Sequence, residues 1–400
     1  MRYLISLEEA IEILDSNVSN LGIEEVNLMD ALDRVLAEDV YSTINNPPFN
    51  KSAMDGYAIK VEDSLNKSKV KVIEKIFAGD VSKCEVTLGT AVRIMTGAMI
   101  PEGANAVIKQ EDVTVEDNYI TLNKNLKLNE NICFVGEDIK EGTLLVKKRK
   151  RLNYADIGIL ASSGIQKVLV YKKPRIALIS TGNEIVDIDN KLVAGKIFNS
   201  NKYTLLSRLM DLGYNIEIIN HIDDDEINIG EYIDDISKKV DLVITTGGVS
   251  VGEKDLLNEA IEKINGEKLF WKIKIKPGSA VLCSKVNKAI VISLSGNPTA
   301  ALTTFELLVK TTLEKLSGNE SLQIKREKAF LVEGFNKKSP QRRFVRGRVL
   351  FEEGKQNVYI TQVKSGNGIL SSNLNSNCII EIDAGTEVIE KNTLVNIIKL

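Results

Sequence analysis

The sequence predicts a multidomain protein of the α/β and β classes, in which a doubly wound α/β domain accompanies two regions built mainly of β-strands. Three observations lead to this prediction. Apolar strand-like runs alternate with helix-like segments over residues 173–318, which is typical of a mostly parallel sheet with right-handed crossovers. Short β-prone runs separated by turn residues occupy residues 58–135, and similar runs return after Gly318.

The bulk composition excludes several classes of protein. The 400 residues carry a net charge of −3, which does not favour general binding to nucleic acids. None of the four cysteines belongs to a Cys-x-x-Cys pair, so neither a zinc knuckle nor a redox pair is expected, and a cytoplasmic location fits. No apolar run reaches membrane-spanning length, and acids interrupt the apolar N-terminal segment, so we expect neither a membrane span nor a signal peptide.

The first two elements are predicted to be structural helices. Ser6–Leu14 begins with Ser6 as a candidate N-cap and has Glu9 three residues later, as in a capping box. Asn27–Leu36 shows a comparable apolar stripe, formed by Leu28, Ala31, Leu32 and Val35.

A turn-rich segment follows at Tyr41–Tyr57. Pro47 and Pro48 force an extended path, and Asp55 then stands at the tip of a turn. On these residues alone, a structural turn in which the carboxylate bonds its own backbone is favoured over a site role.

Residues 58–135 are predicted to form a small β-domain. Thr96 lies in a Thr-Gly turn that ends one of its strands, and Asp138 belongs to a Gly-Glu-Asp turn where the chain leaves the domain. The expected strands are Val70–Ile76, Ala91–Met95, Ala106–Gln110, Val113–Val115 and Tyr119–Leu122.

The α/β region is preceded by a helix expected at Leu152–Ser162. Its strands are predicted at Arg175–Ser180, Asn215–Asn220, Leu242–Thr245 and Ala289–Leu294. The helices that alternate with them are predicted from Asn199/Ser200 to Leu212 and at Glu231–Lys239, Lys254–Ile264 and Thr299–Leu316.

Polar and glycine residues follow the ends of these four strands. Ligands of such sheets bind outside the carboxyl ends of the strands, so we expect the four loops to share a site. Glycine turns expose backbone N–H groups to an anion, and Glu184, Asp224 and Asp255 are candidate ligands for a divalent metal. The alternative is that some of these acids only cap helices. The loops are Thr181–Glu184, Asp223–Asp225, Thr246–Asp255 and Ser295–Pro298.

The segment Phe270–Gly278 alternates strictly between lysine and apolar residues. Alternation on a strand places Lys272, Lys274 and Lys276 on one face, either as solvated lysines of an edge strand or as a row that holds an oxyanion. These residues alone favour neither reading.

The remaining features are read more simply. His221 is the single histidine, and because no nucleophile elbow accompanies it, a structural role is expected. The region after Gly318 is predicted to be a small barrel or sandwich, with several arginines of residues 341–347 near one strand.

Seven segments, in this order, resemble the molybdopterin molybdenumtransferase family (MoeA and the E domain of gephyrin). They are PPFNKSAMDGYA, RIMTGAMIPEGANAVI, GEDI, STGNEI, TTGGVSVGEKD, WKIKIKPG and SGNPTAA. The resemblance implies an elongated homodimer with four domains. These are a linking domain at 1–45 and 138–172 (whose first helix is free to pack elsewhere), an inserted β-domain at 46–137, a MogA-like molybdopterin-binding domain at 173–318 and a β-barrel at 319–400.

The resemblance also implies a reaction in molybdenum cofactor biosynthesis. Adenylylated molybdopterin and molybdate would give the cofactor and AMP with Mg²⁺, and a MogA-like adenylyltransferase would be a partner. Matching positions are Asp55, Thr96, Asp138, Lys272, Lys276 and Arg346, with Arg343 as a near rival of Arg346. Glu184 and Asp255 would hold the metal, and the molybdopterin would contact Thr181, Gly182, Asp224, Gly247, Gly248, Ser250, Gly296, Asn297 and Pro298.

Some positions depart from the family pattern. Ser295 and Ala300 replace the proline and the serine of its LPGNPVS segment, and Ser279 replaces a lysine. A lost hydroxyl at an anion site would shift the preference between molybdate and tungstate or weaken binding, with Thr299 as a candidate substitute. The alternatives to the enzyme are a gephyrin-like scaffold, a protein that binds molybdopterin without inserting metal, and a tungstate-preferring paralogue.

Overall fold

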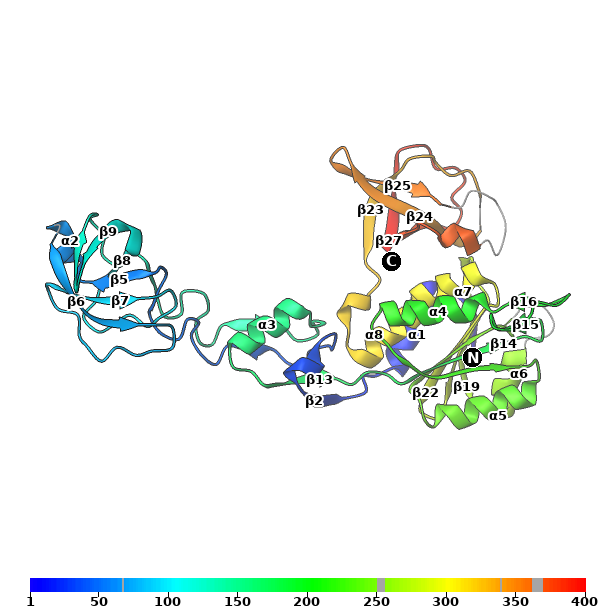
Figure 1. Cartoon of the computed structure of the whole chain (residues 1–400). Helices are drawn as coiled ribbons and strands as arrows, with labels where there is room; N and C mark the ends of the chain where they lie inside the picture. Colours follow the sequence, from blue (N-terminus) through cyan, green and yellow to red (C-terminus); the bar gives the residue numbers. More distant parts are fainter. Residues whose placement is uncertain (67, 250–255, 339, 362–369) are drawn as a thin grey trace.

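The chain forms an elongated molecule of several domains (Figure 1). The computed structural model describes residues 1–66, 68–249, 256–338, 340–361 and 370–400. A β-domain lies at one end, and a narrow region that contains α3 (Tyr154–Ser162) connects it to an α/β domain, beside which a β-barrel packs. The predicted fold class is therefore confirmed.

The α/β domain is built on a seven-stranded sheet with the order β1-β19-β21-β22-β18-β14-β17. Neighbouring strands are parallel except at β21, which is antiparallel to both β19 and β22. The strands are β1 (Arg2–Ile5), β14 (Ile176–Thr181), β17 (Ile216–Ile222), β18 (Leu242–Thr246), β19 (Glu267–Ile273), β21 (Val281–Val286) and β22 (Ala289–Leu294). β14, β18 and β22 are buried along their whole length, which explains their continuous apolar sequences.

Helices cover both faces of this sheet (Figure 1). α1 (Leu7–Asn17), α4 (Ser200–Asp211) and the helical segment 298–317 share one core with Ile176 and Leu178 of β14. α5 (Glu226–Ser237) and α6 (Leu256–Lys263) share the other core with Ala177 and Ile179. Successive residues of β14 thus face opposite layers, as the period of a strand requires.

The segment 298–317 is one continuous helical element, close to the prediction, but it is not uniformly α-helical. It consists of α7 (Pro298–Thr304), a π-helical turn η3 (Phe305–Val309) and α8 (Lys310–Ser317). α5 starts at Glu226, five residues before the predicted start, because the Asp225 side chain caps it and accepts the Asn228 N–H at 2.8 Å.

The first strand and helix pack on the α/β domain. β1 pairs with β19, and Leu7, Ala10 and Leu14 of α1 belong to the same core cluster as the sheet. Residues 1–18, which the sequence-based division assigned to the linking domain with a reservation for the first helix, therefore lie here. The predicted capping box is present, with the Glu9 N–H donating to Ser6 Oγ at 3.1 Å and the Ser6 N–H donating to Glu9 Oε2 at 2.9 Å.

The narrow connecting region is held by two small strand pairs. β2 (Ile23–Asn27) pairs with β13 (Lys167–Tyr171), and β3 (Val40–Tyr41) pairs with β12 (Leu144–Val146). The helix predicted over Asn27–Leu36 is wrong, because this segment contains only the 3-10 turn η1 (Leu28–Ala31). Asp33 has φ of 61°, which ends helical geometry, and the Leu36 N–H donates to Lys150 O instead of to a preceding turn.

The β-domain contains a six-stranded sheet with the order β8-β5-β7-β6-β10-β9. All five predicted strands are present, and the sequence reading missed the short strand β5. The elements are β5 (Gly56–Ile59), β6 (Lys69–Ile76), β7 (Thr90–Ile94), β8 (Ala106–Lys109), β9 (Val113–Glu116), β10 (Tyr119–Leu122), α2 (Val61–Leu65) and η2 (Gln110–Asp112), with a separate pair of β4 (Lys51–Ser52) and β11 (Ile132–Cys133).

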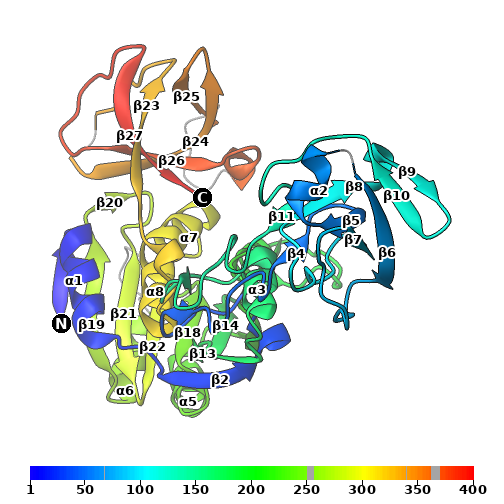
Figure 2. The ribbon, with the colours of Figure 1, turned by 90° about the vertical axis from the view of Figure 1, so that its left-hand side faces the viewer.

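The C-terminal region is a closed barrel, because the strand order β24-β25-β23-β27-β26 returns to its first strand through the pairing of β26 with β24. Its strands are β23 (Arg326–Leu331), β24 (Arg342–Glu352), β25 (Lys355–Ile360), β26 (Cys378–Ile382) and β27 (Thr393–Lys399), with short 3-10 turns η4 (Glu320–Leu322) and η5 (Leu370–Asn373). β20 (Ile275–Lys276) leaves the α/β domain and pairs in parallel with β24, so one strand pair ties the two domains together (Figure 2).

The predicted alternation of the lysine segment is wrong at Lys272. This residue has φ of 63°, and its side chain is buried, whereas Lys274 and Lys276 are exposed. A residue in the left-handed region breaks the period of two, so the three lysines do not form one row.

Candidate functional site

The carboxyl ends of four strands meet at one edge of the seven-stranded sheet. Thr181 lies opposite Ile222, Ser180 opposite Thr246, and Thr246 opposite Leu294, so β14, β17, β18 and β22 end in register. The structure thus places the beginnings of the four predicted loops together. Ser250 and Asp255 lie outside the described residues.

The loops after β14 and β18 pack so closely that glycine is required between them. A Cβ at Gly247, whose φ is 95°, would lie 2.3 Å from Thr181 O, whereas a Cβ at Gly296, in the loop after β22, would make only an ordinary contact of 3.6 Å with Gly247 Cα. A Cβ at Gly248 would lie 3.0 Å from Thr181 Oγ1, and that hydroxyl is buried without a hydrogen-bond partner among the described residues. The result is a cradle of backbone with one orphaned hydroxyl, which suits an anionic or polar ligand.

Two asparagines that the sequence reading did not select as site residues hold this cradle. Asn199 caps α4 and also donates to Ser180 Oγ at 2.8 Å. Asn201 donates to both Thr246 Oγ1 and Gly296 O, each at 2.8 Å. The cap was the only sequence signal for this pair, because contacts to distant loops leave no trace in local spacing.

Near Thr181, Asn183 and Asp224 each bond the other's backbone N–H through a side-chain oxygen. Asn183 Oδ1 accepts the Asp224 N–H at 3.0 Å, and Asp224 Oδ2 accepts the Asn183 N–H at 3.4 Å. Asp224 Oδ1 is buried without a partner among the described residues. Glu184 is exposed, and its Oε2 lies 2.8 Å from the position of a Cβ on Gly182. Two carboxylates therefore flank the Thr181 end of the edge.

An isolated metal centre is not visible in the described part of the chain. No group of three or more His, Cys, Asp or Glu side chains there has the arrangement to hold a metal ion. Of the acid triplet after β17, Asp225 is a helix cap, as the structural alternative predicted for some of these acids.

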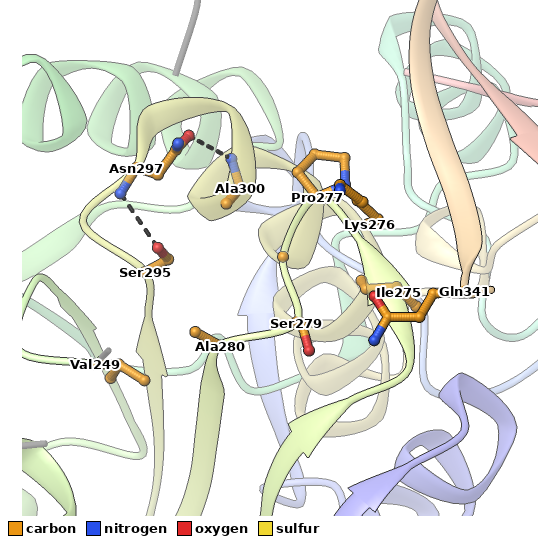
Figure 3. Close-up of a pocket in the computed structure, with 11 residues that line it drawn as sticks. Val249, Ile275, Lys276, Pro277, Ser279, Ala280, Ser295, Asn297, Ala300 and Gln341 are labelled. Atoms are coloured by element: carbon orange, nitrogen blue, oxygen red, sulfur yellow. Dashed lines mark hydrogen bonds between the residues drawn. The ribbon is translucent and has the colours of Figure 1, made fainter. Parts of the chain in front are cut away.

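A cavity of about 390 Å³ opens beside this edge (Figure 3). Ser295, Asn297 and Ala300 lie on one side and the Lys276–Ser279 turn on the other, while Gln341 approaches from the segment that leads into β24. The remaining lining residues are Val249, Ile275 and Ala280.

Ser295 and Ser279, which depart from the sequence pattern of the resembled family, form local hydrogen bonds beside this cavity. Ser295 Oγ accepts the Asn297 N–H at 3.2 Å, and Ser279 Oγ donates to Ile273 O at 2.8 Å. Asn297 caps α7 by accepting the N–H groups of Thr299 and Ala300 at 3.1 and 3.2 Å, and Pro298 is the first residue of that helix.

Lys272 and Lys276 have different surroundings. Lys276 lines the cavity and is the register partner of Arg343, whereas Lys272 is not among the lining residues. The Lys272 ammonium lies over the rings of Trp271 and Tyr3, at 4.3 and 5.6 Å from their centroids. The two cations are therefore near in sequence but differ in exposure.

Arg346 lies in a second cavity, of about 370 Å³, between the α/β domain and the barrel. Only 2% of Arg346 is exposed, and none of its three guanidinium nitrogens has a hydrogen-bond partner among the described residues. Burial lowers the pKa of Arg346 to about 10, with Glu306 opposing and Arg208 reinforcing the shift. A buried cation with unused donors suits an anion.

Asp55 and Thr96 meet in the β-domain. Asp55 Oδ1 accepts both the backbone N–H of Thr96 at 2.7 Å and its hydroxyl at 2.8 Å. These bonds, the backbone one first, lower the pKa of Asp55. The carboxylate is bound to a neighbouring strand end, so the turn that bonds only its own backbone is not what forms.

Asp138 lies where the chain returns from the β-domain. Its Oδ2 accepts Asn46 Nδ2 at 3.4 Å. Within one chain, the β-domain lies far from the carboxyl edge of the α/β sheet (Figure 1). Asp55 and Thr96 therefore cannot complete the site of their own chain in this arrangement.

His221 has the structural role expected from the sequence. Its Nδ1 lies 3.1 Å from Ser180 Oγ, and its Nε2 lies 3.8 Å from Asp223 Oδ1. Ser180 is only 3% exposed and accepts from Asn199, so it is not placed as a nucleophile.

The fold and the site define a multidomain protein that carries a candidate anion-binding site at the carboxyl edge of its α/β domain. Three family models match the chain in order. They are the MoeA N-terminal region (domain I and II) at residues 5–164, a probable molybdopterin binding domain at 177–315 and the MoeA C-terminal region (domain IV) at 328–400.

Relatives and solved structures agree with these models. The chain is 36% identical to a molybdopterin molybdenumtransferase of Staphylococcus epidermidis, over 98% of this chain and 95% of that one. It is 38% identical to the enzyme of that name from Haemophilus influenzae, over 90% and 89%. A crystal structure of a molybdopterin biosynthesis MoeA protein from Pyrococcus horikoshii superposes with a TM-score of 0.83 at 33% identity, over 99% of both chains.

The chain belongs to the molybdopterin molybdenumtransferase family, a family of transferases in molybdenum cofactor biosynthesis. The resemblance inferred from its sequence is confirmed. None of the helices formed by the described residues is long and apolar enough to cross a membrane.

Proposed function

We propose that this protein inserts molybdenum from molybdate into adenylylated molybdopterin, with Mg²⁺ and with release of AMP. The observation that carries the proposal is the edge where four loops meet, with a backbone cradle, an orphaned Thr181 hydroxyl and an orphaned Asp224 oxygen. The family relationship supplies the substrate class. The cavity beside this edge, which Lys276 lines, supports a place for an oxyanion.

The cradle holds the molybdopterin in this proposal. The backbone N–H groups of Gly248 and Gly296 would donate to its phosphate, together with the Thr181 hydroxyl, whereas the N–H groups of Gly247 and Asn297 are already bound to Leu294 O and Ser295 Oγ. Asn201 keeps two of these turns together through bonds of 2.8 Å, so the cradle is formed before the ligand arrives. Preorganisation of this kind lowers the cost of binding and fixes the dithiolene sulfurs against the oxyanion.

Three cations take the oxyanion. Lys276 lines the cavity at the sheet edge, Lys272 lies outside that lining with its ammonium over two aromatic rings, and Arg346 offers unused donors from the second cavity, on the barrel side. Their charge stabilises molybdate and the negative charge that develops as AMP departs, so positioning and electrostatics provide the catalysis. No covalent intermediate with the protein is required.

Glu184 and Asp255 are the proposed holders of Mg²⁺, with the free Asp224 oxygen as an additional donor on the described side. Hard carboxylate oxygens suit this ion, and the orphaned Asp224 oxygen fits such a use. A Mg²⁺ ion held by these residues would supply positive charge to the adenylate phosphate. Glu184 is exposed enough to reach a ligand without a change in the fold.

The proposed active unit is a homodimer. Asp55 and Thr96 form a preorganised acid on a distant domain, and a second chain is needed to bring such a group to the edge. The connecting region also exposes large apolar side chains, with Met29 77% and Tyr154 86% accessible. Exposed apolar side chains of this size favour an interface between chains.

A reconstitution experiment tests the proposal. Purified protein is mixed with adenylylated molybdopterin, Mg²⁺ and either molybdate or tungstate, and AMP and pterin-bound metal are measured. We expect AMP and metal-loaded cofactor in equal amounts, with the ratio between the oxyanions reporting the effect of Ala300 and Ser279. Metal insertion from neither oxyanion would refute the proposal in favour of a binding protein or a scaffold.

A matched pair of variants locates the chemistry. Lys276→Met should abolish insertion, whereas Lys274→Met, which removes the neighbouring exposed lysine outside the cavity lining, should retain it. Equal losses in both variants would contradict the assignment of the cavity. Supplying molybdopterin through a MogA-like adenylyltransferase should support the same turnover as the preformed adenylate.

A further inference from the structure

The cavity that contains Arg346 also contains a buried acid that the reaction as described does not use. Glu306 lies on the π-helical turn η3 and is only 2% exposed. A π turn shifts the phase of a helix and often occurs at functional positions. Here the turn lies between α8 and α7, and α7 lines both cavities, with Ala300 in the cavity at the sheet edge and Leu302 in the cavity of Arg346.

Both carboxylate oxygens of Glu306 are occupied by cations. Oε1 accepts Arg208 Nε at 2.7 Å, and Oε2 accepts Arg208 Nη2 at 3.2 Å and lies 3.4 Å from Lys310 Nζ. Lys310 is itself 7% exposed. Glu306 therefore neutralises charge inside the protein rather than at its surface.

Arg346 shares the cavity without sharing the acid. No hydrogen bond joins its guanidinium to any described residue, although Arg208 and Glu306 line the same cavity. Asn373, which also lines it, has both side-chain polar atoms buried and unpartnered. The side chains of Arg346 and Asn373 thus have no hydrogen-bond partner among the described residues, whereas both carboxylate oxygens of Glu306 are bound.

The buried side chains leave a defined net charge. Arg208 and Arg346 line the cavity and Lys310 lies behind it, in contact with Glu306; these three contribute three positive charges and Glu306 one negative charge, so the balance of the four buried groups is +2. Asp211 also lines the cavity and pairs with Arg208, but its side chain is 69% exposed and is screened by water, so it is not counted among the buried groups. A balance of +2 matches a tetrahedral dianion such as molybdate.

We propose that Glu306 is a positioning residue that sets the oxyanion affinity of Arg346. By binding Arg208 and Lys310, it keeps them away from the anion, leaves Arg346 as the available donor, and limits the buried positive charge around the cavity to what one dianion balances. This inference rests on the proposed function, because it takes Arg346 to be an oxyanion ligand.

Titration calorimetry with sodium molybdate alone tests the inference at low and high ionic strength. Glu306→Gln raises the buried charge to +3, so molybdate should bind about tenfold tighter at low salt, and the gain should disappear at high salt. Arg208→Gln combined with Glu306→Gln returns the charge to +2 and should restore the affinity of the unmodified protein. Glu314→Gln is the matched control, because Glu314 is 8% exposed on α8 and pairs with Gln323 rather than with a cation.

The outcomes are separable. Unchanged or weaker binding by Glu306→Gln, or no restoration in the double variant, overturns the inference and makes Glu306 a structural residue. If Glu306→Gln does not fold, Lys310→Met provides the test. This substitution lowers the balance of the buried groups from +2 to +1, so it should weaken molybdate binding about tenfold. Absence of molybdate binding by the unmodified protein would instead count against the proposed function.

Discussion

Replacement of Gly247 by alanine is the sharpest perturbation of the proposed molybdopterin cradle. The new Cβ would lie 2.3 Å from Thr181 O, whereas ordinary contact begins near 3.4 Å, so one of the two loops must move by about 1 Å. The φ of 95° adds strain of about 1–3 kcal/mol for a residue with a side chain.

Gly195→Ala separates these two effects. Gly195 has φ of 80°, but its added Cβ would meet no atom within 4 Å. Both variants therefore carry the backbone strain, and only Gly247→Ala displaces the end of β14. A misplacement of about 1 Å at a reacting centre costs on the order of 100-fold in rate.

The assay is single-turnover metal insertion, with thermal unfolding measured in parallel. We expect Gly247→Ala to lose on the order of 100-fold in rate and Gly195→Ala to keep it, while both lower the melting temperature by a few degrees. Equal rates in the two variants would show that the close approach of Gly247 to Thr181 is irrelevant to the site.

Three further perturbations address single contacts. Asn297→Ala removes the cap of α7 and should lower the unfolding free energy by about 1 kcal/mol in a denaturant titration, whereas Asn297→Asp should not. Thr96→Val removes one of two bonds to Asp55, so the pKa of that carboxyl, followed by NMR, should rise part of the way to its ordinary value. Lys202, and after it the Tyr203 hydroxyl, lower the pKa of Asp187 from its ordinary 3.8 to about 2, so the stabilisation is complete above pH 3.8 and is lost as pH falls toward 2. Lys202→Met should flatten that loss in thermal unfolding curves.

Much of the fold follows from the sequence because its longer elements carry their own signals. The central strands of the α/β sheet are continuous apolar runs, and α1, α4 and α7 begin at side chains that cap them. The prediction failed at Asn27–Leu36, where an apolar spacing that suits a helix is overridden by hydrogen bonds to residues more than a hundred positions away. Tertiary pairing of this kind has no local signature.

The candidate site, like the fold, has features that the sequence predicts and features that it does not. The meeting of four loops at one edge follows from topology alone, since parallel strands that end in register place their loops together. The cross-loop bonds of Asn201, the left-handed backbone of Lys272 and the π turn that carries Glu306 do not follow, because each depends on packing between distant segments. The local sequence around Asp55 favoured a structural turn, and only the resemblance to the family selected this residue for the site.

Subunit mixing tests the central claim most directly, because it asks whether a site joins the Lys276 cavity of one chain to Asp55 of another. Asp55→Ala and Lys276→Met proteins, each inactive alone, are unfolded, mixed in equal amounts and refolded. Random pairing gives half heterodimers with one intact site each, so roughly a quarter of the unmodified activity should return. Recovery of no activity from heterodimers that have demonstrably formed would contradict the account.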